Sequence, residues 1–405
     1  AEKAQQQAVE LEAKQKIQEE KIKADSEMVS ASEDDADEVV EAAEYKIVTN
    51  KAEITFTNRG GDIVSYKLIG HKDKETDEGV EMALDVSSSN RAFALSIGEF
   101  GSPILNEYFK ASVKDPYTIL FHKDYEVKDE NGNVSRYTIG KRYTFSPDDY
   151  AFKLDVSIVC RDGTDGLNRN GSSYTLRTSP NIGPRYDKKN RYEVRQYLAL
   201  NGAKRIRRNI QEKTFDINQM KWAGVGGKYF TVLVKPENPE SMNPYVKSVV
   251  KGDNSELCQV VLSRKNFEGK SINDTYYVYV GPRQESELIK YNDQTKNAWG
   301  LVNAKLNEAL QTSGFLSPIE KILKWGLDKI NIIAHNWGVS IIILTLILKI
   351  ILFPLNKNTA IGSLKMQKLQ PKMQEIQEKY KGDQQKIGIE MQKLYKANGY
   401  NPMSG

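Results

Sequence analysis

The chain has 405 residues, of which 39% are hydrophobic and 28% charged, and its formal net charge is +4. This length is sufficient for two or three domains with a large apolar core. The excess of positive charge is local, because residues 356–405 carry nine Lys and four acidic residues, whereas residues 1–348 have a net charge of −2. The composition therefore excludes a protein that is basic along its whole length.

Residues 1–45 are polar and rich in Ala, Glu, Gln and Lys. They end in an acidic run, from Glu33 to Glu44, that holds seven acidic residues and no base. Such a composition does not bury enough apolar surface to fold alone. The sequence therefore predicts a flexible charged linker over residues 1–45.

An antiparallel β domain is predicted over residues 46–285. Apolar and polar residues alternate from Phe152 to Ile158, which places one face of a strand on a core and the other in water. Because no helix of crossover length intervenes, a β-sandwich is the expected assembly. Further signals are the strand-like runs Lys228–Val234 and Tyr276–Val280, and the hairpin dipeptide Asn131-Gly132 between the runs 125–129 and 135–145.

The two cysteines, Cys160 and Cys258, both fall in this predicted domain. If this domain is exported across a membrane, the two thiols could be oxidised to a disulfide. One pair is nevertheless not a disulfide framework for a domain of this size. Buried free thiols are therefore favoured over a bond between them.

Residues 286–316 are interpreted as a helical connector, and an amphipathic helix is predicted over residues 317–335. Ser317, Pro318 and Glu320 form a capping box at its start. A helix of this kind just before an apolar span is expected to lie along the outer membrane surface; the alternative is that it packs on the β domain. Its apolar side includes Ile319, Ile322, Leu323, Trp325 and Ile330.

A transmembrane helix is predicted over residues 336–356, because Trp337 to Leu355 is the only stretch that can cross a bilayer. Its Ile, Leu, Val and Phe residues contribute roughly 4–8 kcal/mol to insertion, against a cost of about 3 kcal/mol for Lys349. A charge inside a span faces protein or water rather than lipid, which makes Lys349 a candidate functional residue. The alternative is that its amine extends to the membrane interface.

A helical hairpin is predicted over residues 357–400, on the cytoplasmic side because of its excess of Lys. Gly382 is expected to close the first helix, Asp383 to cap the second, and Pro371 to bend the first arm. The apolar seam comprises Leu369, Met373, Ile376, Tyr380, Ile387, Met391 and Leu394. The outer face could be solvated, or could contact anionic lipid or ribosomal RNA, through Lys365, Lys368, Lys372 and Lys379.

No catalytic or metal site is indicated, and no cofactor is predicted. The three histidines, His71, His122 and His335, share no metal-ligand spacing and are expected on the surface or in packing roles. Gly224–Lys228 is not a phosphate-binding loop, because Tyr229 stands where Ser or Thr would bind magnesium. The basic run Lys204–Arg208 is interpreted as a solvated loop or a lipid contact.

Several segments resemble the YidC/Oxa1/Alb3 membrane protein insertases, in the form found in bacteria with two membranes. The helical segments that carry this resemblance are Asn336–Ile343, Lys349, Phe353–Leu355, Lys365-Met366, Leu369–Lys372 and Leu394–Lys396. Those in the β region are Arg59–Ile63, Trp222, Lys228–Phe230 and Tyr279–Pro282. Together they extend the resemblance over residues 45–405.

The resemblance implies a mixed fold: a large antiparallel β-supersandwich in the periplasm, a membrane-surface helix, the first of five core transmembrane helices and a cytoplasmic hairpin. It also implies a positively charged groove within the membrane, lined by Lys349 and Thr345, that receives polar parts of incoming membrane proteins. Lys349 stands where the family usually has Arg, so the charge is kept while the bidentate fork is lost.

The implied location is the bacterial inner membrane. The implied partners are nascent membrane proteins, Sec translocon components, the ribosome or targeting factors at the hairpin, and the lipid bilayer. Residues 401–405 resemble the start of the next membrane helix, so the chain is expected to lack the family's first anchor and four remaining core helices. No enzymatic activity is implied.

Two alternatives remain open. One is a membrane-anchored periplasmic β-sandwich that binds a partner or glycan. The other is an enzyme similar to sugar mutarotases, although His71 and His122 stand in no recognisable catalytic context.

Overall fold

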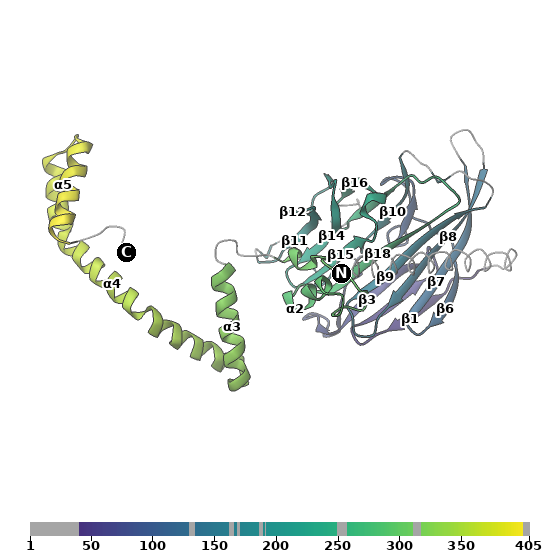
Figure 1. The fold of residues 1–405 in the computed structure, drawn as a ribbon, viewed down its shortest axis with the longest axis horizontal. Coiled ribbons are helices and arrows are strands. Elements are labelled where there is room, and N and C mark those ends of the chain that lie inside the picture. Colours follow the sequence, from purple (N-terminus) through teal and green to yellow (C-terminus); the bar gives the residue numbers. More distant parts are fainter. Residues whose placement is uncertain are drawn as a thin grey trace, which may run out of the picture. The chain divides into compact units, whose positions relative to one another are not determined.

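The structure is a computed structural model that describes residues 40–128, 134–161, 166–167, 171–185, 189–190, 192–248, 257–310 and 317–399. Two compact units are divided between Gln311 and Thr312. The first holds three antiparallel β-sheets and the second holds helices (Figure 1). Most of the predicted linker, the Asn131-Gly132 dipeptide and residues 401–405 lie outside the described residues.

The largest sheet consists of β6 (Lys110–Asp115), β7 (Thr118–Lys128), β8 (Val134–Phe145), β9 (Ala151–Cys160), β11 (Arg195–Asn201), β12 (Lys204–Asn209), β14 (Met220–Gly227), β15 (Phe230–Pro236) and β18 (Ser271–Pro282). Its strand order is β12-β11-β14-β15-β18-β9-β8-β7-β6, and every neighbouring pair is antiparallel. This confirms the predicted antiparallel β class.

Two smaller sheets complete the first unit. The four-stranded sheet is formed in sequence order by β1 (Glu44–Val48), β2 (Ala52–Thr57), β3 (Asp62–Lys72) and β4 (Gly79–Glu81). The five-stranded sheet consists of β13 (Thr214–Asp216), β16 (Met242–Lys247), β17 (Val261–Lys265), β10 (Ser172–Arg177) and β5 (Leu95–Ile97), in that order across the sheet.

Aromatic side chains join both smaller sheets to the large one. Phe56 of β2 lies 5.0 Å from Tyr143 of β8, measured between ring centroids. On the other small sheet, Phe215 of β13 stacks on Tyr197 of β11 at 4.5 Å. Because aromatic pairs stabilise by about 0.5–1.5 kcal/mol beyond their buried area, these contacts fix the small sheets against the large one.

The prediction that one face of β9 packs on the core is confirmed, and the prediction that the other face lies in water is wrong. Phe152 and Ile158 are fully buried, as predicted, but Asp155 and Ser157 on the opposite face are buried too. β9 lies in the middle of the nine-stranded sheet, where side chains of β8 and β18 flank it, and Thr275 of β18 donates a hydrogen bond to Asp155 at 2.6 Å. A period of two does not reveal how deep in a sheet a strand lies.

Short helices lie between the strands of the first unit and after the last of them. They are the 3₁₀ helices η1 (Pro239–Ser241), η2 (Ile289–Asn292) and η3 (Leu306–Ala309) and the α-helix α2 (Glu285–Leu288).

Cys160 and Cys258 are both buried and free, which confirms the preferred prediction over a disulfide.

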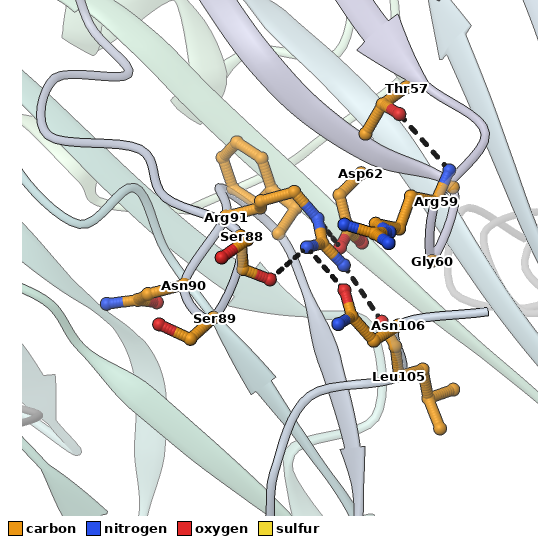
Figure 2. Close-up of polar contacts among 12 residues, drawn as sticks. Thr57, Arg59, Gly60, Asp62, Ser88, Ser89, Asn90, Arg91, Leu105 and Asn106 are labelled. Atoms are coloured by element: carbon orange, nitrogen blue, oxygen red, sulfur yellow. Dashed lines mark hydrogen bonds and ion pairs between the residues drawn. The ribbon is translucent and has the colours of Figure 1, made fainter. Parts of the chain in front are cut away.

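A buried ion cluster centred on Asp62 joins the start of β3 to β8. Its carboxylate is paired with the ammonium of Lys141 and, at 2.9 Å, with the guanidinium of Arg91. The three side chains have exposed fractions of 1%, 0% and 3%, respectively. Arg91 also donates to the carbonyl of Leu105 and to Asn106, both at 2.9 Å (Figure 2). Every charge in the cluster therefore has hydrogen-bond partners, which buried charges require.

Two glycines make this cluster possible at the turn between β2 and β3. Gly60 and Gly61 both have positive φ, +68° and +61°. A Cβ on Gly60 would lie 2.6 Å from the carbonyl oxygen of Leu105, and one on Gly61 would lie 2.6 Å from Phe121 Cβ. The turn also supplies carbonyls, since Lys141 donates to Gly60 at 3.2 Å and Tyr143 to Gly61 at 3.0 Å. Only glycine fits either position.

Replacing Asp62 tests this cluster. Asp62→Ala leaves the ammonium of Lys141 and the guanidinium of Arg91 buried without a counter-charge, and we expect a loss of about 3–5 kcal/mol in the free energy of unfolding. Urea denaturation measures it. Glu53→Ala is the control: it removes the exposed pair with Lys46, at 2.6 Å, and is expected to cost at most about 1 kcal/mol. Equal losses for the two variants would contradict the assignment.

His71 provides a pH-dependent test of the same domain. Its Nε2 lies 2.9 Å from the hydroxyl of Tyr150, and burial, with a smaller effect of Lys51, lowers the pKa of the imidazole below its usual 6.5. The unfolded chain therefore binds more protons than the folded one as the pH falls below 6.5, so stability is highest above this pH and decreases on acidification. We expect His71→Gln to reduce the slope of unfolding free energy against pH. An unchanged slope would exclude this contribution.

Candidate functional site

The second unit begins with α3 (Ser317–Ala334), whose predicted apolar residues divide into two groups. The exposed side chains are those of Ile319, Ile322 and Trp325, and the half-buried ones are those of Leu323 and Ile330. The helix packs against α4 (Trp337–Lys379), with Gly326 and Leu344 at the contact. The apolar stripe is wider than this contact, so part of it has no protein cover among the described residues.

A two-residue turn separates α3 from α4. His335 has a positive φ of +47°, which ends α3, and its backbone N–H donates to Asn331 at 2.9 Å. Asn336 is the N-cap of α4, because its side-chain oxygen accepts from the N–H groups of Gly338 at 2.9 Å and Val339 at 3.2 Å. The hydroxyl of Ser340 reaches back to Asn331 at 3.3 Å. These bonds fix the turn.

In the described part of the chain, α4 is the one helix long and apolar enough to cross a membrane. Its apolar side chains are largely uncovered by protein; Ile350 and Phe353, for example, are 73% and 65% exposed. A core helix of a water-soluble protein would bury such residues. The exposure therefore favours a lipid environment for this part of α4.

Lys349 and Thr345 lie one turn apart on the same side of α4. Both side chains are exposed, and the hydroxyl of Thr345 donates to the carbonyl of Ile341 at 2.7 Å, so its hydrogen is already used within the helix. From Trp337 to Lys349 the helix rises about 18 Å, and about 9 Å remain to Leu355. Lys349 therefore lies well inside the apolar segment, towards its C-terminal end.

The apolar segment and the first arm of the hairpin form one continuous helix. α4 runs without interruption through Pro354 and Pro371, so the proline at which a bend was predicted does not end the helix. The turn that follows confirms two predictions: Gly382 has a positive φ of +99°, and Asp383 caps α5 (Gln384–Ala397) by accepting from the N–H of Lys386 at 3.1 Å.

The packing of the hairpin follows the predicted seam. Leu369 of α4 is 5% exposed. The hydroxyl of Tyr395 on α5 lies 3.9 Å from the sulfur of Met373 on α4 and donates to it. The remaining seam residues, Ile376, Tyr380, Ile387, Met391 and Leu394, are partly covered. By contrast, the side chains of the four candidate lysines are exposed: Lys365, Lys368, Lys372 and Lys379. Of these, Lys365 donates to the carbonyl of Gly399 at 3.2 Å.

The structure assigns the other candidate motifs to the β domain. Lys204–Arg208 was expected to form a loop, and this prediction is wrong. The residues form most of strand β12, whose pairing with β11 gives them a regular backbone. Gly224 to Gly227 lie in β14, which agrees with the rejection of a phosphate-binding loop. His122 is buried in β7. Among the described residues, no group of three or more His, Cys, Asp or Glu residues could hold a metal ion.

The ion cluster was missed by reasoning from the sequence. Arg59–Ile63 was noted as a motif, but neither Lys141 nor Arg91 was connected with it. A signal was present: Lys141 occupies an inward position in β8, between the buried residues Ile139 and Tyr143. A lysine at an otherwise apolar alternate position indicates a buried counter-ion.

A β domain followed by a helix long and apolar enough to cross a membrane and by a helical hairpin fits the class of membrane proteins that carry a large folded domain. Two sequence families match the chain: residues 44–325 match the YidC periplasmic domain, and residues 329–405 match the 60Kd inner membrane protein. The chain belongs to the YidC family.

The curated relatives agree with this assignment. Membrane protein insertase YidC of Treponema denticola is 38% identical over 371 residues, which cover 89% of the chain and 63% of the relative. The protein of the same name from Treponema pallidum is 34% identical and covers 92% of the chain and 65% of the relative. The chain thus spans somewhat less than two thirds of the length of these relatives.

A solved structure, described as an active YidC insertase with the first transmembrane domain resolved, shares 18% identity with the chain. The match covers 91% of the chain and 68% of the solved structure, with a TM-score of 0.24. The family assignment rests on the sequence matches.

Opening the hairpin tests its seam. Leu369→Glu places a charge in the contact between α4 and α5, and we expect α5 to lose protection of its backbone amides by at least about tenfold in hydrogen exchange. Leu364→Glu is the matched control, since Leu364 lies on the same helix and is 59% exposed. Equal loss of protection in both variants would mean that the seam does not hold α5.

Proposed function

We propose that the chain acts in the insertion and folding of inner-membrane proteins, and that Lys349 and Thr345 line a hydrophilic groove within the membrane that receives polar parts of the substrate. The observation that carries this proposal is an ammonium group well inside the apolar segment of the membrane-capable helix α4. The names of the YidC relatives support it.

The mechanism follows from the cost of transferring polar groups into lipid. A groove that holds water and a positive charge shortens the distance over which a substrate's polar tail is desolvated, and it attracts acidic residues of that tail. The apolar span of the substrate then partitions into lipid at about 25 cal/mol per Å² of buried apolar area. This drives the process without nucleotide hydrolysis, so no enzyme is required.

The proposed topology places the β domain in the periplasm and the α4–α5 hairpin in the cytoplasm, within a multi-pass protein. The exposed apolar side chains of α3 (Ile319, Ile322 and Trp325) suit the outer surface of the bilayer. The exposed lysines of the hairpin (Lys365, Lys368, Lys372 and Lys379) suit the ribosome or a targeting factor. Cooperation with the Sec translocon belongs to the same proposal.

Photocross-linking from position 345 tests the groove. With a photoreactive residue at Thr345 of the full-length protein, we expect an adduct with a ribosome-bound nascent membrane protein. The matched control is Ile350, which lies on a different side of the same helix and is expected to give lipid adducts only. Substrate adducts from both positions, or from neither, would contradict the groove and favour a single-span binding module.

Charge substitutions at Lys349 test whether its positive charge attracts acidic residues of the substrate. In proteoliposomes, Lys349→Glu is expected to slow the insertion of a substrate with an acidic translocated tail by about tenfold, which corresponds to the loss of about 1.4 kcal/mol. Lys349→Arg keeps the charge and is expected to retain the rate. A substrate with a neutral tail should respond less to Lys349→Glu; an equal response would exclude attraction as the cause.

A further inference from the structure

The edge strand β12 is strongly cationic. It is the last strand of the nine-stranded sheet, and four of its six residues are Lys or Arg, in the sequence KRIRRN. Lys213, a few residues further on, is exposed as well. Two acidic residues lie near this edge: Glu212, which pairs with Lys247, and Glu308, which pairs with Arg205. The edge therefore keeps a clear excess of positive charge.

The two faces of β12 have different roles. Arg205 and Arg207 lie opposite Leu200 and Leu198 of β11 and contact η3: Arg205 forms the ion pair with Glu308, and Arg207 donates to the carbonyl of Glu308 at 3.2 Å. Lys204 and Arg208 alternate with them and are exposed. Arg205 and Arg207 thus bind Glu308 of η3. The side chains of Lys204 and Arg208 are exposed, and Arg208 also donates to the carbonyl of Arg207 at 2.8 Å.

The chain leaves the β domain at this same edge. Besides the bonds from β12, Trp222 donates to the carbonyl of Lys305 at 3.2 Å, and Arg283 donates to that of Ala309 at 2.9 Å. Residues 305–309 are therefore fixed beside β12. Ser317, where α3 begins, follows Ala309 by eight residues in the sequence.

We propose that the edge strand β12 docks on anionic phospholipid headgroups at the membrane surface, through Lys204 and Arg208. This rests on the proposed placement of α3 at that surface. Charge complementarity favours lipid as the occupant, and the chain leaves the β domain at this edge only eight residues before α3 begins. Each basic residue near an anionic membrane strengthens binding by about fivefold, and added salt weakens the attraction. The docked edge would hold the β domain beside the point at which the chain meets the bilayer.

Cations on an edge strand also prevent sheets from pairing edge to edge, and the test must separate this role from lipid binding. The full chain is reconstituted in nanodiscs of phosphatidylcholine alone or with 30% phosphatidylglycerol. A fluorophore is attached at Asn209→Cys, an exposed position of β12, and is quenched by headgroup-labelled lipid. The native thiols are both buried, which limits background labelling.

We expect quenching at position 209 only in the anionic nanodiscs, and its reduction by high salt. The double variant Lys204→Glu/Arg208→Glu is expected to weaken it by at least about 25-fold, measured as the anionic lipid fraction required for half-quenching. The matched control, Lys110→Glu/Lys114→Glu, makes the same change in net charge on β6 at the opposite edge of the sheet and is expected to leave quenching unchanged.

Three results would overturn the proposal: equal quenching in neutral and anionic nanodiscs, no quenching in either, or equal effects of the two double variants. Self-association of the β12 variant with unchanged quenching would assign the cations to edge protection instead. A second fluorophore, at Ile322→Cys of α3, separates this failure from failure of the proposed topology. If position 322 is quenched in both nanodiscs and position 209 in neither, α3 lies on the membrane and only the docking of β12 is wrong.

Discussion

The buried carboxylate of Asp62 is the constraint on which the β domain depends. A charge without water is stable only when counter-charges and hydrogen bonds surround it. Here they come from separate parts of the chain: Lys141 on β8, and Arg91, which also bonds to Leu105 and Asn106. The cluster thus specifies how the β2–β3 turn meets the large sheet, and the aromatic contact between Phe56 and Tyr143 lies between the same two sheets.

A second set of charges fixes the segment at which the chain leaves the β domain. Arg205, Arg207 and Arg283 bind the backbone or carboxylate of residues 308–309, where the chain leaves the β domain. The two sets differ in purpose. The Asp62 cluster is closed and fully buried, which suits a structural role, whereas β12 keeps exposed cations beside the chain exit, which suits an interaction with an anionic surface.

Much of the fold was predictable because its signals are local. Alternation located β9, the runs around Phe230 and Val278 located β15 and β18, and Asp383 marked the start of α5. The errors concern neighbours. The second face of β9 was expected in water because its position in the middle of a sheet is not encoded in its own residues. Lys204–Arg208 was expected to be a loop because four of its five residues are charged. Its strand conformation comes from pairing with β11, which the residues themselves do not indicate.

The sequence by itself determined the class of the domain, the apolar segment with Lys349 inside it, the hairpin seam and, through its motifs, the family. These features depend on periodicity, composition and the order of residues along the chain. Only the tertiary structure decided which charges meet: Asp62 with Lys141 and Arg91, and Arg205 with Glu308. The reason is that each of these pairs joins residues at least 29 positions apart, and the attraction between charges depends on their distance in space, which no local pattern records.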